Sequence, residues 1–142
     1  MKRLSIICAM AAVILLSGCV HNNGDIGDWF GMWKIERITV DGEDDPEYKK
    51  DAFIAFQSSV FMVRVSYPEI SSGYQYMGRW NEQEGKLTLE FNTKESAVPS
   101  EQLHLHFKKD NILQILQRGG GRKTLQLVAE DGKTYTYYLK SW

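Results

Sequence analysis

Two histidines stand two positions apart in a segment that alternates polar and apolar residues. In a β-strand the side chains of His104 and His106 would project from the same face. Two imidazoles at this spacing can share a metal ion, with Glu101 or His21 as a third ligand. The residues of the opposite phase are apolar and are predicted to be buried: Leu103, Leu105 and Phe107. We therefore assign both histidines to the solvated face of a strand, and the sequence predicts no metal site.

The acidic stretch 41–47 is the second group of residues with ligand chemistry. Carboxylates bind calcium, but this stretch lacks the D-x-[DN]-x-[DN]-G order of a dedicated calcium loop. We interpret it as a solvated connection between two strands.

Residues that could carry out catalysis are not arranged in any known pattern. The sequence has no G-x-S-x-G elbow and no Ser, His and Asp grouping at a convincing spacing. The run Gly119–Gly121 is not followed by a helical pattern or by a Lys-Ser/Thr pair, so it predicts a turn and not a phosphate loop. We therefore expect a protein that is not an enzyme and that has no cofactor.

Aromatic side chains are the more informative feature, with four Trp, seven Tyr and six Phe in the chain. Several of them share the predicted inward phase of their strands, where they would either line a pocket for an apolar or planar ligand or fill the interior. The candidate ligand-binding residues are Tyr74, Tyr76, Trp80, Phe91, Tyr135 and Tyr137.

The elements that must position these residues are short strands separated by turn residues. Alternating runs predict eight or nine strands, and only 46–52 could form a single helical turn. A change of apolar phase between Ile35 and Ile38 predicts a bulge or a strong twist in the first strand. Hairpin turns, such as the one at Asp131–Gly132, favour an all-β, antiparallel up-and-down barrel of about eight strands over a Greek-key sandwich.

The N-terminus has the features of a targeting segment. Lys2 and Arg3 precede an apolar run over 6–16, which is too short to cross a membrane as a helix. We divide the chain into a signal peptide (1–18), a flexible tether (19–27) and one barrel domain (28–142). The leader contains two of the 17 basic residues and none of the 18 acidic ones, so the remaining chain is acidic. This charge argues against nucleic acid as a partner.

Leu16-Ser17-Gly18-Cys19 resembles the lipobox of bacterial lipoproteins. The resemblance implies cleavage before Cys19 and attachment of a diacylglycerol to its thiol, with palmitate or a similar chain on the new amine. Two or three chains anchor a protein durably in a membrane. Val20 stands where an Asp would favour the inner membrane, so the outer membrane is expected, with the domain facing either the periplasm or the outside. The alternative is an ordinary secretory leader with a coincidental cysteine.

Gly31-Met32-Trp33 matches the G-x-W signature of lipocalins, and the pattern of most of 28–140 is similar to small bacterial lipocalin-like (calycin-type) lipoproteins. In that family the Trp closes the base of the barrel, and an Arg often lies across it. Here Lys140 is the nearest cation expected, and Arg122 begins the preceding strand. The connection 41–51 is too short for the two-helix lid of fatty-acid-binding barrels, so a lidless relative is expected.

Two functions remain open. The first is a membrane-anchored module that binds a small apolar or amphipathic ligand in the cell envelope. The second is a filled barrel that serves as a structural or protein-interaction module, for example as an inhibitor, with another envelope protein as its partner. The fold does not distinguish them.

Overall fold

The computed structural model describes residues 27–66, 74–92 and 103–142. Within these residues every regular element is a β-strand. The predicted signal peptide, nearly all of the tether, Cys19, Val20, His21 and Glu101 lie outside the described residues. The strands are β1 (Gly31–Val40), β2 (Glu43–Asp44), β3 (Ala52–Gln57), β4 (Val60–Val65), β5 (Tyr74–Gln83), β6 (Lys86–Phe91), β7 (Asp110–Gly119), β8 (Arg122–Val128) and β9 (Thr134–Ser141).

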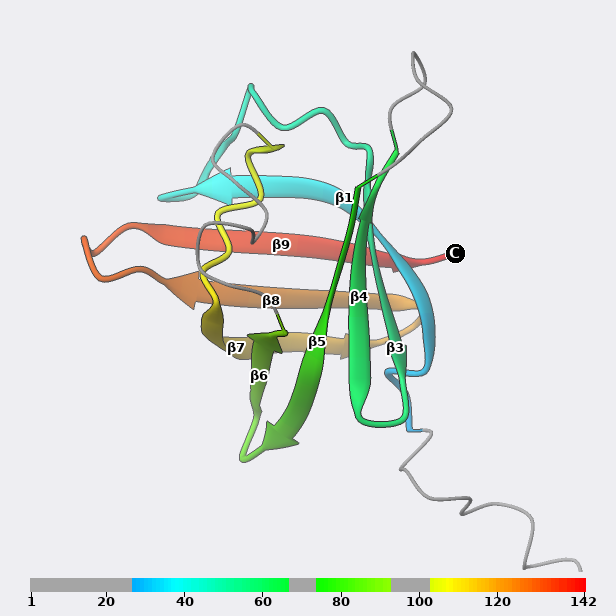
Figure 1. Cartoon of the computed structure of the whole chain (residues 1–142). Helices are drawn as coiled ribbons and strands as arrows, with labels where there is room; N and C mark the ends of the chain where they lie inside the picture. Colours follow the sequence, from blue (N-terminus) through cyan, green and yellow to red (C-terminus); the bar gives the residue numbers. More distant parts are fainter. Residues whose placement is uncertain (1–26, 67–73, 93–102) are drawn as a thin grey trace, which may run out of the picture.

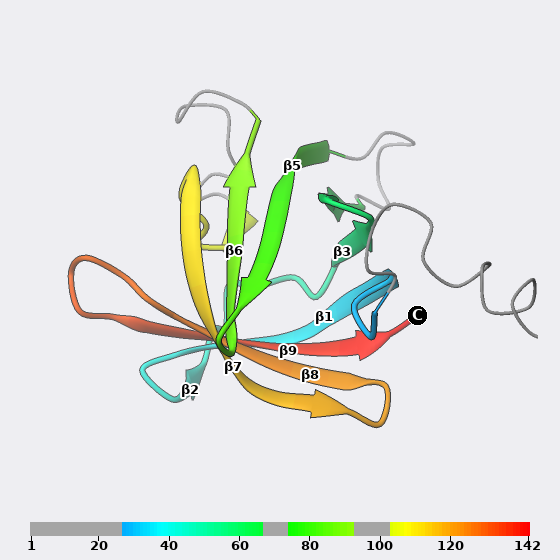
Figure 2. The same ribbon diagram turned by 90° about the horizontal axis from the view of Figure 1, so that it is seen from below.

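The strands close into an antiparallel barrel. Strand β1 pairs with β3, each later strand pairs with the next one, and β9 returns to pair with β1 (Figure 1, Figure 2). The two-residue strand β2 is an addition to the far end of β1 and takes no part in closure. The predicted eight-stranded up-and-down barrel is therefore confirmed. No helix in the described residues is long and apolar enough to cross a membrane.

Alternating burial builds the core from inward-facing side chains. Strand β3 buries Ala52, Ile54 and Phe56, and β6 buries every second residue from Leu87 to Phe91. The register between β1 and β9 shifts between Ile35 and Arg37, which confirms the predicted bulge. The bulge lets β1 bury Ile35 and Ile38, although they are three positions apart.

The prediction of a strand over 103–107 is wrong. Leu105 and Phe107 are buried as predicted, but His104 and His106 have φ angles of 51° and 61°, so the segment is not extended. Residues 103–109 form an irregular segment before β7. Asn111 holds this segment in place, because its Oδ1 accepts from the Lys108 N–H and its Nδ2 donates to the carbonyl of Lys108.

This segment and the 41–51 connection cover the barrel end where β1 finishes. The Tyr137 hydroxyl donates to the Leu105 carbonyl at 2.7 Å, and the Phe107 ring stacks on that of Tyr137. Tyr48 is also buried, and its hydroxyl donates to the Ile35 carbonyl at 2.6 Å. Burial raises the pKa of Tyr48 above its ordinary value. Irregular segments therefore fill this end of the barrel.

Candidate functional site

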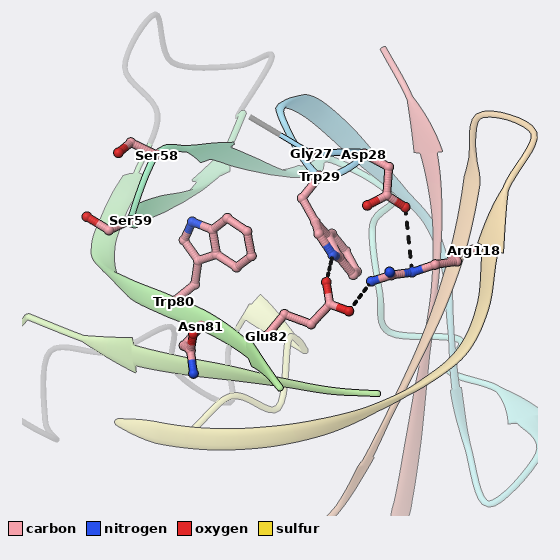
Figure 3. Close-up of a pocket in the computed structure, with 9 residues that line it drawn as sticks. All are labelled: Gly27, Asp28, Trp29, Ser58, Ser59, Trp80, Asn81, Glu82 and Arg118. Atoms are coloured by element: carbon pink, nitrogen blue, oxygen red, sulfur yellow. Dashed lines mark hydrogen bonds and ion pairs between the residues drawn. The ribbon is translucent and has the colours of Figure 1, made fainter. Parts of the chain in front are cut away.

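A half-open pocket of about 460 Å³ lies at the opposite end of the barrel, where β1 begins. Four segments that are distant in sequence form it: the entry to β1, the β3–β4 turn, the end of β5 and the end of β7 (Figure 3). Its lining residues are Gly27, Asp28, Trp29, Ser58, Ser59, Trp80, Asn81, Glu82 and Arg118.

The floor of the pocket rests on two packed tryptophans. Trp29 is 2% exposed, and its ring packs 6.5 Å from that of Trp33, the signature residue. The Trp33 indole donates to the Trp29 carbonyl at 2.8 Å, which fixes the entry turn against the first strand. The signature Gly31 has a φ of 114°, a conformation that favours glycine at this entry.

A buried lysine lies across both tryptophans. The Lys123 ammonium is 4.4 Å from the ring centroid of Trp29 and 4.7 Å from that of Trp33, within the range of cation–π attraction. Its side chain is 1% exposed, and its Nζ lies 2.8 Å from the Asp28 carboxylate. Lys123 is therefore the cation that lies across the signature Trp33 at the base of the barrel.

Neither of the cations expected from the sequence occupies this position. Lys140 and Arg122 both point toward Glu36 on the outside of the barrel. Lys123 could have been found, since it shares the phase of Leu125 and Leu127, the buried residues of its strand.

The rim of the pocket is a network of charged groups. One oxygen of Glu82 accepts from the Trp29 indole at 2.6 Å, and the other pairs with Arg118. The hydrogen bond to Glu82 raises the pKa of Arg118. Burial would raise the pKa of Asp28, but the hydrogen bond and charge of Lys123, together with Arg118, hold it below its ordinary value. The Asp28 carboxylate is therefore ionised at neutral pH, and Arg118 pairs with both Asp28 and Glu82.

Trp80 presents a donor that this network does not use. Its ring packs 5.2 Å from Phe56 and 6.4 Å from Trp29, so it continues the aromatic floor (Figure 3). Its indole Nε1 is buried and has no hydrogen-bond partner within the described part of the chain. A buried N–H without an acceptor is costly, but this Nε1 has almost no exposed surface, so a ligand could accept from it only after the Trp80 ring turned.

Of the six aromatic candidates from the sequence, Trp80 is the one that the structure brings to this pocket. Phe91 and Tyr137 are fully buried in the packed core, and Tyr76 and Tyr135 pack against it from positions nearer the other end. Tyr74 is 53% exposed. The six side chains therefore do not line one common cavity.

The two histidines meet an aspartate at the far end of the barrel. His106 Nε2 lies 2.7 Å from Asp45 Oδ2, and the His104 ring packs edge-on against that of His106. One potential ligand atom from each of the three residues lies within 4.8 Å of the others. The histidines are thus not on a solvated strand face, and Asp45, from the acidic stretch, is a neighbour that the sequence analysis missed.

Comparison with known proteins identifies the family and supports the fold. A barrel of eight meandering strands, with an entry tryptophan under a buried cation, defines a lipocalin-like protein. The chain belongs to the family described as the lipocalin-like domain, whose model matches residues 14–114.

Two solved structures share the fold. A lipocalin-like protein from Bacteroides uniformis aligns with a TM-score of 0.63 at 13% identity, over 82% of this chain and 100% of that one. An uncharacterized protein from Bacteroides eggerthii aligns with a TM-score of 0.61 at 16% identity, over 80% and 99%. No curated protein matches the sequence.

Proposed function

We propose that this protein binds a small amphipathic ligand at the pocket between Trp80 and Arg118, and not at the centre of the barrel. The observation that carries the proposal is the pocket itself, in which the packed rings of Trp29 and Trp80 form an aromatic floor and Arg118 supplies a cation. A volume of about 460 Å³ is within the usual range for small-molecule sites. Such a ligand would place a planar or apolar body against Trp80 and its polar group near Arg118.

The role that we propose is binding and not catalysis. The charged groups of the pocket are paired with one another, and lipocalin-like barrels are typically non-enzymatic. The ion pairs with Glu82 and Asp28 also hold Arg118 in one position. A polar group of the ligand would therefore meet a guanidinium whose position is fixed.

Replacing Trp80 by phenylalanine is expected to weaken binding about fivefold. The change keeps a smaller aromatic ring on the floor and removes part of the apolar contact that the indole makes with the probe, which is worth about 1 kcal/mol. The probe is anilinonaphthalene sulfonate, which has a planar body and an anionic acceptor, and its fluorescence is titrated against the full chain. Trp142→Phe is the matched control, because Trp142 is 78% exposed and packs on Phe53, outside the pocket. Equal probe affinity in the wild type and the Trp80→Phe variant would contradict the proposed site.

We also propose that the domain is held in the cell envelope by a lipid on Cys19, at the outer membrane. The support is the lipobox-like segment at 16–19, together with Val20 in the place of the aspartate that favours the inner membrane. The tether that follows is polar and contains glycine, which suits a chain that spaces a domain from a membrane surface.

Cys19→Ala is expected to abolish lipid attachment. In cells fed an alkyne analogue of palmitate, the wild-type chain takes up label and the variant takes up none, because the thiol that accepts the diacylglycerol is missing. Cys8→Ala is the control, since Cys8 lies inside the predicted leader. Label that persists in the Cys19→Ala variant would end the lipoprotein interpretation.

A filled barrel that binds another envelope protein is the second candidate. The observation in its favour is the tight interior, where Phe91, Leu105 and Leu113 are all fully buried. Cross-linking in intact membranes distinguishes the two functions, because an interaction module would yield a stoichiometric protein partner and a ligand carrier would not.

A further inference from the structure

We propose that Asp45, His104 and His106 form a binding site for a divalent transition metal of the zinc type, which clips two segments together over the barrel end. This site lies at the opposite end of the strands from the pocket described above. The metal site is independent of the proposed ligand function.

The donor set favours zinc over calcium or magnesium. Two imidazole nitrogens and one carboxylate oxygen are ligands that zinc commonly takes, whereas calcium and magnesium prefer oxygen ligands throughout. The three potential ligand atoms lie within 4.8 Å of one another. Ligands of tetrahedral zinc, at about 2.0 Å from the metal, are separated by roughly 3.3 Å, so small side-chain rotations would bring all three onto the metal, with water as the fourth ligand.

The Asp45 carboxylate is oriented so that one of its oxygens can bind a cation. Asp45 Oδ1 accepts from the Glu47 backbone N–H at 3.0 Å, which directs Oδ2 toward His106. The side chain of Asp45 is 7% exposed and that of His106 is 19% exposed, so water competes only weakly with a metal ion for their ligand atoms. Asp45 Oδ2 and His106 Nε2 are 2.7 Å apart and share a hydrogen bond. A metal ion that binds both atoms would replace the proton of that hydrogen bond.

The imidazoles are held by their own backbone and by a neighbouring ring. His104 and His106 both adopt positive φ angles, and their ring centroids lie 6.3 Å apart although the segment is not a strand. The Tyr135 ring stacks on that of His106 at 4.3 Å with an angle of 15° between the planes. This stacking restricts rotation of the His106 ring.

A metal here would stabilise the cover of the barrel. Leu105 stands between the two histidines, is fully buried, and accepts from the Tyr137 hydroxyl. Asp45 belongs to the connection after β2, 61 positions away from His106 in sequence. A bond from the metal to both segments would fix Leu105 and Phe107 in the interior and would raise the thermal midpoint of unfolding.

The test uses the full chain without a polyhistidine tag, purified in detergent and stripped with a chelator. Calorimetric titration with zinc chloride is expected to show one ion per chain and an increase in the thermal midpoint. His104→Gln and Asp45→Asn should each weaken binding at least about tenfold. His104→Gln is the more informative variant, since the ion pair between Asp45 and His106 remains and supports the fold. Bound cobalt should give the visible absorption of a tetrahedral site with nitrogen and oxygen ligands.

His21→Gln is the matched control, because His21 is the third histidine of the chain and belongs to the predicted tether. The proposal holds if this variant binds zinc as the wild type does while His104→Gln, shown to be folded by circular dichroism, does not. It is overturned if zinc does not bind at millimolar concentration. It is also overturned if binding survives both His104→Gln and Asp45→Asn, or if it depends on His21 in their place.

Discussion

Asp28→Ala is expected to lower the free energy of unfolding by about 3 kcal/mol. The reason lies with its partner, since Lys123 is 1% exposed and its Nζ is 2.8 Å from the Asp28 carboxylate. Without that carboxylate a full positive charge would remain buried between two tryptophan rings. Cation–π attraction to Trp29 and Trp33 offsets only part of the desolvation cost. We place the loss at the lower end of the usual range because Asp28 itself is about half exposed.

Urea unfolding of Asp28→Ala, Lys123→Met and the double variant measures this effect. Lys123→Met replaces the buried charge by an apolar chain of similar length and leaves Asp28 to be hydrated, so it should cost less than about 1 kcal/mol. In the Lys123→Met background, Asp28→Ala should cost less than about 0.5 kcal/mol. An equal cost of Asp28→Ala in both backgrounds would show that the carboxylate does not act through Lys123.

The dependence on pH provides a second measurement on the same pair. The pKa of Asp28 in the folded protein is below its ordinary value of 3.8, because Lys123 and Arg118 outweigh the effect of burial. A carboxyl group with a lowered folded pKa stabilises the fold at pH values above 3.8, and this contribution is lost as the pH falls through the folded pKa. The stability difference between wild type and Asp28→Ala should therefore be constant near neutral pH and should shrink below pH 3.8.

The sequence was sufficient to predict the barrel because its strands obey local rules. Alternation with period 2 locates β3, β4 and β6, and turn residues such as Asp131–Gly132 mark where the chain reverses. The failure at 103–107 has a physical cause. Two left-handed residues, His104 and His106, reproduce the alternating burial of a strand without its extended backbone, so the residue pattern alone cannot distinguish the two conformations.

The sites depend on contacts that no local pattern encodes. Asp45 reaches His106 across 61 positions, and Lys123 reaches Asp28 across 95. The identity of the buried cation could nevertheless have been predicted from the sequence, because Lys123 has the inward phase of a strand whose other inward residues are apolar. The pocket was harder to predict from the sequence. It combines the end of β5 with the end of β7 and the turn after β3, and these segments are brought together only by closure of the barrel.

Gly78→Ala is expected to destabilise the protein by about 3 kcal/mol, although this glycine does not need an unusual backbone conformation. Gly78 lies in the middle of β5, opposite Phe61 on one side and Phe91 on the other. A Cβ atom added there would stand 2.0 Å from the Glu90 carbonyl oxygen and 2.6 Å from a ring carbon of Phe61. The Phe61 ring could rotate, but the carbonyl belongs to the β5–β6 ladder and cannot move without breaking that pairing.

Gly120→Ala is the matched control for the same measurement of unfolding in urea. Gly120 has a φ of 63° and no atom within 4 Å of an added Cβ, so the substitution costs only the strain of a left-handed alanine, about 1 kcal/mol. The comparison separates crowding from backbone strain, since the two variants introduce the same methyl group. A near-ultraviolet circular dichroism change confined to Gly78→Ala would report displacement of Phe61 and Phe91, whose rings pack 5.0 Å apart. Equal losses in the two variants would contradict the close approach of Gly78 to the Glu90 carbonyl and the Phe61 ring.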